Sequence, residues 1–481
     1  MNKERVILIV PPYSDSASIF ERVEKISLEN EKKNKEIRIY PPLGLLYLAG
    51  NLVKLENLKV ELIDSAALRL NQKDIIQILK QGTFPRIVGI SLMSVNLFSV
   101  ASLIKAIKSE FINPPLIVVG GPHISKVPQN TFDLKADYGF VGDADQSFKQ
   151  FVQNTITNKP INDIPGLIWK KDGEIKINPP LMIKNLSSLP HPYRELVPKN
   201  AYVYPAFAGY FTSVVTTRGC PFNCIYCGVP HKRHYFERNV EDVIDELQKL
   251  RDYDYINFVD DCFTTNRKRT VKLCQEMIKE KFKFRWGCAT RIDCVDPEVM
   301  KLMRQAGCYD IRFGVESGNE EIRHQVKGGK RITNDFYHEM LKEAKKAGLT
   351  TVGFFLLGLP NETLKTMKET IEFAKKVPLD FAYFGTVIPV PGSKLFEIAK
   401  SEGKLDDSIW IDLINGKTEI PQYIPGSFTL EQVKLLCRKA DFEFYLRPSY
   451  ILKRFFYITN FREFSHHAKM GIRLFWNRLD L

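Results

Sequence analysis

The sequence predicts an α/β protein with an open, flavodoxin-like parallel sheet, a partial TIM-like (β/α)6 barrel and a helical C-terminal region. Short β-branched runs alternate with helix-like periodicities from residue 5 to about 155, and the alternation restarts near residue 209. Strands that alternate with helices form right-handed βαβ units and a parallel sheet. We therefore expect domains at 1–155 and 209–400, joined by a linker at 156–208 and followed by a basic helical region at 401–481.

The first domain is predicted from five strand-like runs separated by helical patterns. The strands are Arg5–Val10, Lys59–Ile63, Ile87–Ser91, Leu116–Val119 and Tyr138–Val141. The helices are Leu43–Val53, Lys73–Leu79, Leu97–Lys108 and Asp145–Thr155. An open parallel sheet binds ligands beyond the carboxyl ends of its strands, where these loops are rich in Gly, Ser and Pro.

Prolines such as Pro160, Pro165, Pro179 and Pro190 interrupt every periodicity in the linker. The barrel strands that follow are Thr212–Thr216, Tyr255–Val259, Arg285–Thr290, Asp310–Gly314, Thr351–Leu357 and Phe381–Val387. The helices between them are Val240–Leu250, Thr270–Lys279, Pro297–Ala306, Asp335–Ala347 and Thr363–Lys376. The chemistry of such a barrel lies at the carboxyl ends of its strands.

Composition is that of an ordinary globular protein, with 44% hydrophobic and 26% charged residues and a net charge of +13. No apolar run is long enough to span a bilayer, and the run Val6–Val10 is too short for a secretory signal. We therefore expect a cytoplasmic protein whose nine cysteines are reduced thiols.

Three cysteines, Cys220, Cys224 and Cys227, lie on one loop directly after the first barrel strand. At this spacing their sulfurs can face a compact metal cluster. A [4Fe–4S] cluster normally takes four thiolates, so three leave one iron open to a ligand. A structural zinc site completed by His231 or His234 is the alternative, and it would make the chain a zinc-stabilised binding protein without catalytic activity.

This CxxxCxxC run, with Tyr226 before the last cysteine, resembles the fingerprint of radical S-adenosylmethionine enzymes. In that family the open iron of the cluster binds S-adenosylmethionine, and one electron cleaves the sulfonium to give a 5′-deoxyadenosyl radical. The resemblance covers roughly residues 205–400. It implies that Cys220, Cys224 and Cys227 hold a [4Fe–4S] cluster.

Four later strand ends resemble the cofactor contacts of the same family. The resemblance implies that Asp260 and Asp261 face the methionine amino group, and that Arg291 pairs with the methionine carboxylate. It also implies that Glu316 accepts from the ribose hydroxyls, and that the stretch containing Gly358 lies along the adenine. The residue types alone also allow an aspartate pair that caps the next helix, a surface arginine and, for Glu316, a solvated loop carboxylate.

The first domain resembles the cobalamin-binding branch of this family, and Asp64, Ser91, Gly120 and Gly121 stand at the matching strand ends. One motif is missing. The Asp-x-His-x-x-Gly run that supplies an imidazole to cobalt is absent, because Asp64 is followed by Ser65 and Ala66. We expect cobalamin with no protein nitrogen below the cobalt, and we do not expect His123 to replace the missing ligand.

With cobalamin, the resemblance implies methyl transfer to an unactivated carbon, and a radical ring cyclase or oxidoreductase is the alternative. The expected partners are a small-molecule or lipid-like substrate and a reducing electron donor such as a flavodoxin or ferredoxin. A tRNA methylthiolating enzyme is set aside, because residues 1–219 contain no cysteine.

The tail at 447–481 is basic and amphipathic. This pattern allows either peripheral contact with an anionic membrane or a helix packed over the barrel mouth. No nucleic-acid partner is expected, because no recognised binding module accompanies the tail.

Overall fold

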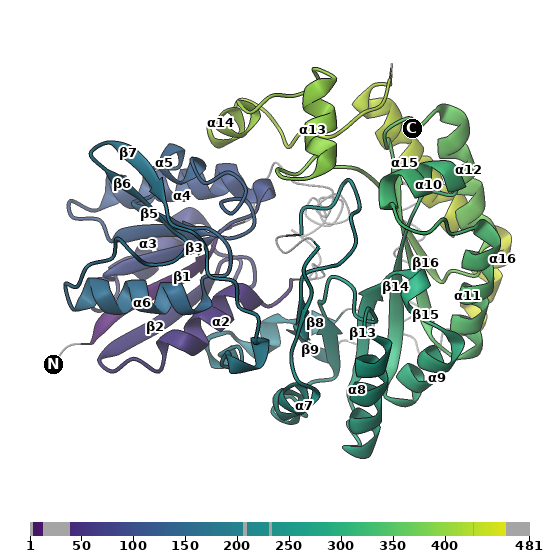
Figure 1. Ribbon diagram of the computed structural model, residues 1–481, viewed down its shortest axis with the longest axis horizontal. Helices are drawn as coiled ribbons and strands as arrows, with labels where there is room; N and C mark the ends of the chain where they lie inside the picture. The colour runs from purple at the N-terminus through teal and green to yellow at the C-terminus, as the bar shows by residue number, and fades with distance from the viewer. Residues whose placement is uncertain (1–2, 13–38, 205–208, 230–232, 427, 458–481) are drawn as a thin grey trace.

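The computed structural model describes residues 3–12, 39–204, 209–229, 233–426 and 428–457. Two α/β domains lie side by side, with the N-terminal domain on the left of Figure 1 and the second domain on the right. Helices of the C-terminal region arch over both of them. The two-domain α/β architecture predicted from the sequence is therefore confirmed.

The first domain is a seven-stranded sheet in the order β2-β1-β3-β4-β5-β6-β7. Its first five strands are parallel, so their carboxyl ends meet at one edge. They are β1 (Glu4–Val10), β2 (Leu58–Asp64), β3 (Ile87–Ser91), β4 (Leu116–Gly120) and β5 (Tyr138–Phe140). The helices are α2 (Leu43–Leu52), α3 (Gln72–Lys80), α4 (Leu97–Glu110), α5 (Asn130–Asp133) and α6 (Asp145–Ile156). Every predicted strand of this domain is present.

The end of the first domain differs from the sequence prediction. β6 (Leu167–Lys171) and β7 (Glu174–Ile177) form a hairpin that continues the first sheet in antiparallel pairing. The turn is Asp172-Gly173, with φ of 52° and 84°. Positive φ at both turn residues matches the right-handed twist of the flanking strands, which explains the Asp-Gly pair. Placing the domain boundary at residue 155 was therefore wrong, since this sheet extends to Ile177.

The second domain is a seven-stranded sheet in the order β16-β15-β14-β13-β12-β9-β8. The short strand β8 (Val203–Tyr204) is antiparallel to its neighbour, and the other six are parallel. These six are β9 (Gly209–Val214), β12 (Tyr255–Phe258), β13 (Arg285–Thr290), β14 (Cys308–Glu316), β15 (Thr350–Leu357) and β16 (Phe381–Thr386). The edges are β8 and β16, so the sheet is the partial barrel that the sequence predicted.

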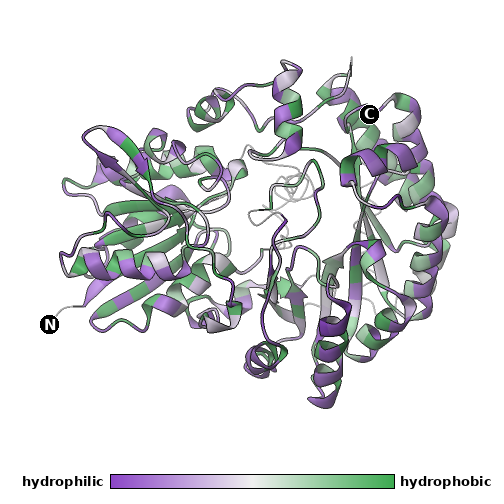
Figure 2. Cartoon of the chain, viewed as in Figure 1, coloured by the Kyte–Doolittle hydropathy of each residue, from purple (hydrophilic) through white to green (hydrophobic). Residues whose placement is uncertain are grey.

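Helices cover the outer, convex face of this sheet (Figure 1). They are α7 (Val240–Gln248), α8 (Arg267–Lys279), α9 (Pro297–Gln305), α10 (Glu320–Lys327), α11 (Asn334–Lys346) and α12 (Leu364–Lys376). Figure 2 shows hydrophobic residues along the strands and hydrophilic residues on the outer faces of helices such as α8. The short helix α10 was not predicted, because only Ile322 and Val326 mark its buried face.

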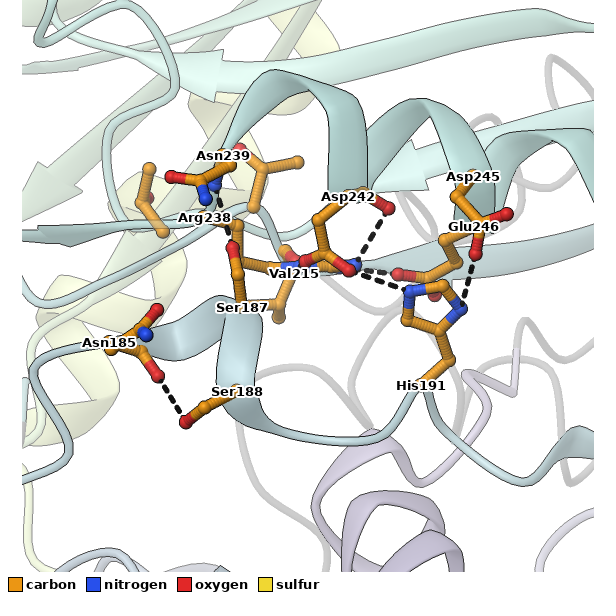
Figure 3. Close-up of polar contacts among 12 residues, drawn as sticks. Asn185, Ser187, Ser188, His191, Val215, Arg238, Asn239, Asp242, Asp245 and Glu246 are labelled. Carbon is orange, nitrogen blue, oxygen red and sulfur yellow. Dashed lines mark hydrogen bonds and ion pairs between the residues drawn. The ribbon is translucent and has the colours of Figure 1, made fainter.

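The linker docks on α7 through polar side chains (Figure 3). His191 Nε2 lies 2.9 Å from Asp242 Oδ1, and Ser187 Oγ accepts from the backbone N–H of Asn239 at 2.8 Å. Arg238 contacts both Asp242 and the fully buried Glu246. These contacts fix the path of the chain between the two sheets.

The C-terminal region returns to both domains. α14 (Ile409–Ile414) lies above the first domain, where Trp410 packs edge-on against His123 with ring centroids 5.2 Å apart. α13 (Lys394–Ser401) packs on both domains, through Phe396 in the core of the first and Leu395 in a cluster with α10. α15 (Leu430–Tyr445) lines the edge strand β16, and α16 (Pro448–Tyr457) follows it. Tyr450 OH donates to the carbonyl of Asp380 at 2.9 Å, at the amino end of β16.

The start of the tail therefore docks away from the barrel mouth. Most of the predicted amphipathic segment lies outside the described residues. No helix in the described part of the chain is long and apolar enough to cross a membrane.

Candidate functional site

The cysteine loop leaves the barrel at the carboxyl end of β9. Thr217–Arg218 forms the two-residue strand β10, which pairs with β11 (Phe236–Glu237), and Gly219 then turns the chain with φ of 88° into Cys220. The loop is fastened at both sides. Ile225 N–H donates to the carbonyl of Val326 at 2.8 Å, and the carbonyl of Ile225 accepts from Leu395 N–H at 2.9 Å. The loop is therefore held between α10 and α13.

None of the three thiols Cys220, Cys224 and Cys227 is in a disulfide, and all three are half-buried. Burial, together with the nearby Cys262, Asp261 and Cys227, raises the pKa of Cys220 to about 12, although a backbone hydrogen bond from Phe222 acts to lower it. Without a cation the Cys220 thiol therefore stays protonated at neutral pH. Metal ligation requires thiolates and releases their protons. A positively charged iron cluster would therefore stabilise the thiolate form of these cysteines.

The described residues contain no group of three Cys, His, Asp or Glu side chains gathered around a single metal ion. In a cubane each thiolate binds a different iron, so its ligands are spaced more widely than those of one ion. His231, one proposed zinc ligand, lies outside the described residues. His234 is exposed, and its ring stacks on Phe236 with centroids 6.1 Å apart. The donor set and its spacing along one loop fit a cluster.

Asp260 and Asp261 follow β12 but have different surroundings. Asp260 is buried, and its oxygens accept from Thr216 N–H at 2.6 Å, Thr216 Oγ at 2.5 Å and Thr217 N–H at 2.9 Å. Asp260 thus holds the turn that leads into the cysteine loop. Asp261 is exposed and close enough to Cys220 to raise its pKa. Of the two, Asp261 is better placed to meet a cofactor.

Replacing Asp260 with alanine should lower the iron retained per chain after anaerobic reconstitution by at least about half, because the Thr216 and Thr217 donors lose their acceptor. Asp261→Ala is the matched control. It should keep the parent's iron content and instead raise the S-adenosylmethionine concentration needed for half-maximal cleavage. Equal iron content in Asp260→Ala and the parent would show that Asp260 does not position the loop.

Arg291 directly follows β13 and lies beside the cysteine loop. Its guanidinium makes a two-pronged contact with Asp293, both distances being 2.9 Å, and lies 4.1 Å from the ring centroid of Phe222. Nη1 is 3.9 Å from Cys224 Sγ. A buried cation next to a cluster ligand can attract a carboxylate or stabilise a thiolate. The predicted contact with the methionine carboxylate stays a prediction.

Glu316 sits at the end of β14, where the register shifts against β15 and its own φ is 69°. A non-glycine residue with positive φ is strained, and such strain gathers at functional sites. Burial raises the pKa of Glu316, while Lys327, 4.0 Å away, and a hydrogen bond from Tyr226 lower it. Tyr226 also contacts Cys224. The predicted ribose acceptor is thereby linked to the cysteine loop.

Lys327 was missed by sequence reasoning. It is buried in the last turn of α10, and its Nζ donates to the carbonyl of Gly314. Its own carbonyl lies 3.7 Å from Cys224 Sγ. Its only signal in the sequence was a lysine before Gly328-Gly329, which is also typical of an ordinary helix end.

Gly358 turns the chain after β15 with φ of 87°. Its N–H and that of Leu359 donate to one oxygen of Glu362, at 2.8 and 2.9 Å. Burial raises the pKa of Glu362 to about 7. A Cβ at position 358 would approach Val433 to 3.2 Å, so this glycine allows close packing as well as a turn. Its predicted place beside adenine stays a prediction.

At the carboxyl ends of the strands of the first sheet, three small residues form a partly exposed surface, here called the ledge. The strand interiors are buried, but Ser91, Gly120 and Gly121 are half-exposed. Gly121 has φ of 106°, and a Cβ there would meet the carbonyl of Leu92 at 2.6 Å. Among the described residues other than its two chain neighbours, the atoms nearest to a Cβ built on Gly120 belong to Phe140, at 3.9 Å. A ledge of small residues at this edge suits a broad ligand such as cobalamin.

Asp64 does not belong to that ledge surface. It is only 1% exposed, and its carboxylate accepts from Tyr202 OH at 2.7 Å and from Ala67 N–H at 3.0 Å. Burial raises the pKa of Asp64 despite these donors. The structure thus gives its side chain a contact between the first domain and the linker, and the cofactor contact predicted for it stays a prediction.

His123 is also fully engaged. Its Nδ1 lies 2.8 Å from Ser94 Oγ and its Nε2 lies 2.9 Å from Asn130 Oδ1, so both ring nitrogens have partners. Burial lowers the pKa of His123 to about 4. These contacts support the expectation that His123 is not a cobalt ligand.

Because His123 must be neutral in the folded state, its contribution to stability is complete above pH 6.5 and declines as the pH falls toward 4. Lowering the pH from 7 to 5 should cost about 2 kcal/mol of unfolding free energy through this residue. Denaturant unfolding followed by tryptophan fluorescence measures the loss, and His123→Asn should reduce it. An unchanged pH dependence in that variant would contradict the assignment.

Comparison with known proteins gives matches over both domains. The family model described as the radical SAM superfamily matches residues 214–374, and that described as a B12 binding domain matches residues 38–152. The uncharacterized methyltransferase PH0819 of Pyrococcus horikoshii is 35% identical over 426 residues, covering 86% of this chain and 90% of the relative. Cytidylyl-2-hydroxyethylphosphonate methyltransferase of Streptomyces wedmorensis is 24% identical, covering 84% and 86%.

Other similar proteins differ in their reaction or share only the fold. The anaerobic magnesium-protoporphyrin IX monomethyl ester cyclase of Cereibacter sphaeroides is 25% identical, covering 76% of this chain and 62% of the cyclase. The cobalamin-dependent S-adenosylmethionine radical enzyme OxsB has a TM-score of 0.70 at 16% identity, covering 98% and 71%. The methyltransferase TsrM of Kitasatospora setae has a TM-score of 0.66 at 18% identity, covering 83% and 75%.

Proposed function

The chain belongs to the radical SAM superfamily, in the branch with an N-terminal B12-binding domain, and from this premise we propose that it catalyses cobalamin-dependent methyl transfer to an unactivated carbon. The protein is thus an enzyme. The observation that carries the proposal is the cysteine loop at the carboxyl end of β9, which an ion pair between Arg218 and Asp145 joins to the carboxyl-end edge of the first sheet. When bound, the cluster supplies the electron that cleaves S-adenosylmethionine, and cobalamin supplies the methyl group.

The residues of this chain hold and orient these groups. Cys220, Cys224 and Cys227 provide the thiolates, and Asp260 sets the turn before them. Arg291 and Glu316 offer a cation and a carboxylate on either side of the loop, suited to the carboxylate and the ribose hydroxyls of S-adenosylmethionine. The apolar cluster that includes Leu356, Ile225 and Tyr226 packs between strand and loop and helps to exclude water.

The test is anaerobic incubation of the reconstituted full chain with S-adenosylmethionine and a one-electron reductant. We expect 5′-deoxyadenosine, and bound cobalamin in the visible spectrum. Comparing small molecules in a deletion strain and its parent then identifies the substrate. A product that gains one methyl group supports methyl transfer. A new ring or a loss of hydrogen favours the reaction of the cyclase relative and would overturn the proposed methyl transfer.

Bound Co(II) cobalamin should show no nitrogen splitting from a lower axial ligand in its EPR spectrum. Ala66 stands where the missing motif would place histidine, and both nitrogens of His123 already have partners. Without a nitrogen donor below it, cobalt gives a spectrum without that splitting. A clear imidazole pattern in the parent, lost in His123→Asn, would contradict this account of the ledge.

Two partner proposals accompany the reaction. The cluster needs a reducing donor, and we propose a small acidic electron carrier of the flavodoxin or ferredoxin type, since the chain carries a net charge of +13. Cluster reduction by such a carrier should slow as the salt concentration rises.

For the tail at 447–481 we propose contact with anionic lipid and a lipid-like substrate. Co-flotation with phosphatidylglycerol vesicles tests the contact, and no difference from neutral vesicles would contradict it.

A further inference from the structure

Arg218 connects the two domains beside the cysteine loop. Its Nη1 lies 2.8 Å from Asp145 Oδ2 and its Nη2 lies 3.1 Å from Asp145 Oδ1, a two-pronged ion pair. Nη1 is also 3.2 Å from Asp143 Oδ2. Arg218 belongs to the second domain, whereas Asp143 and Asp145 belong to the first. One guanidinium group therefore joins the domains through two carboxylates.

This contact is shielded from water. The side chains of Arg218, Asp143 and Asp145 are 17%, 17% and 6% exposed. The guanidinium also lies over the ring of Tyr47 in α2, 5.2 Å from its centroid. Low exposure makes a charge pair stronger and less sensitive to salt than a surface pair. The parallel fork of an arginine on a carboxylate also fixes orientation.

Each end of the contact adjoins one of the cofactor sites. Asp143 lies in the loop after β5 and Asp145 begins α6, both at the edge that carries the half-exposed ledge. On the other side, only Gly219 separates Arg218 from Cys220, and Asp260 fixes the residues just before it. If the segment that carries Asp143 and Asp145 moves, Arg218 and the adjacent cysteine loop are therefore expected to move with it.

Other contacts also join the domains. Tyr40 packs edge-on against Phe211 with ring centroids 5.7 Å apart, the C-terminal region packs on both domains, and the linker adds hydrogen bonds. Tyr202 OH donates to Asp64 at 2.7 Å, and Tyr193 N–H donates to the carbonyl of Leu46 at 3.0 Å. These bonds join the linker to the first domain without touching the cysteine loop. They can hold the domains together when Arg218 is changed, so the effect of Arg218 on geometry can be measured in a folded protein.

We propose that Arg218 is a positioning residue, which through Asp145 and Asp143 sets the distance and orientation of the cobalamin ledge relative to the cluster loop. This inference rests on the proposed function. Methyl transfer needs the substrate, the S-adenosylmethionine-derived radical and cobalt within near-contact geometry, and a misplacement of about 1 Å can cost about 100-fold in rate. A rigid contact between the two cofactor loops meets that need.

The first test uses the full chain without cofactors and amide hydrogen exchange. Asp145→Asn keeps the side-chain shape but removes the charge, and Arg218→Lys keeps the charge but loses the fork. In both variants we expect exchange to become about tenfold faster in residues 142–146 and also in residues 216–220. The matched control is Arg267→Gln, which breaks an ion pair with Asp296 on the outer face and should change neither segment. Faster exchange in 142–146 alone would mean a purely local role and would overturn the proposal.

The second test uses the loaded enzyme and pulsed EPR between Co(II) cobalamin and the reduced cluster. The parent and Arg267→Gln should give one narrow distance distribution, and Asp145→Asn and Arg218→Lys a broader or shifted one at unchanged iron and cobalamin content. A distribution identical to the parent's in both variants would overturn the inference. If the parent bound neither the cluster nor cobalamin, the proposed function would be wrong. The hydrogen-exchange experiment would still test whether Arg218 couples the two segments.

Discussion

Replacing Cys224 with alanine should reduce 5′-deoxyadenosine formation to the level of the background without enzyme. Cys224 lies between Arg291 and the carbonyl of Lys327 and contacts Tyr226, so its sulfur is at the centre of the contacts that surround the loop. With only two thiolates left, the loop no longer provides the three ligands that a site-differentiated cluster needs. Product is measured by chromatography after anaerobic reconstitution of parent and variant.

The matched control is Cys437→Ala. Cys437 is likewise in no disulfide but lies buried in α15, in a separate apolar cluster with Val433 and Met367. It should keep the parent's activity. The circular dichroism of Cys224→Ala should match that of the parent, because no strand depends on this side chain. If a folded Cys224→Ala variant formed 5′-deoxyadenosine at the parent's rate, the assignment of the cluster to this loop would be wrong.

Replacing Glu246 with alanine should lower the free energy of unfolding by about 3–5 kcal/mol, the usual effect of removing one partner from a buried ion pair. Its carboxylate is 1% exposed and contacts Arg194 of the linker at 2.5 Å as well as Arg238. Burial raises the pKa of Glu246, but the two guanidinium groups outweigh burial and lower it overall. Without the carboxylate two buried cations face each other.

Denaturant unfolding of the parent and Glu246→Ala at pH 7 measures this loss. Glu241→Ala, on the same helix but with an exposed partner in Lys272, is the control and should change stability little. The Glu246 contribution should also fall in acid. Its folded pKa is lowered, so the stabilisation is present above the ordinary pKa of a glutamate and is lost as the pH drops below it. A variant as stable as the parent would show that the linker docks without this ion pair.

The parts of the fold that were predictable follow a local pattern. Strands such as Ile87–Ser91 and Arg285–Thr290 are short apolar runs between turn residues, and the structure has them within the predicted bounds. The cysteine loop was found because three thiols on one short segment have few other uses. The hairpin around Asp172-Gly173 carried a readable signal, but the many prolines nearby favoured a linker.

What could not be predicted depends on contacts between distant segments. Nothing in the sequence around Asp64 indicates that the hydroxyl of Tyr202, far along the chain, will donate a hydrogen bond to its carboxylate. Asp260 and Asp261 are adjacent and chemically identical, and only the turn at Thr216 gives them different surroundings. The ion pair of Arg218 with Asp145 needs both domains in place before it exists. Sequence reasoning therefore located the strand ends of the site but could not assign each side chain its partner.

The most direct test of the whole account is the metal content of the full chain purified and reconstituted without oxygen. Three thiolates on a loop fastened to α10 and α13 predict about four irons per chain with a broad brown absorbance. They also predict an EPR signal of the reduced cluster that changes when S-adenosylmethionine is added. One tightly bound zinc per chain, no colour and no such signal would contradict the account.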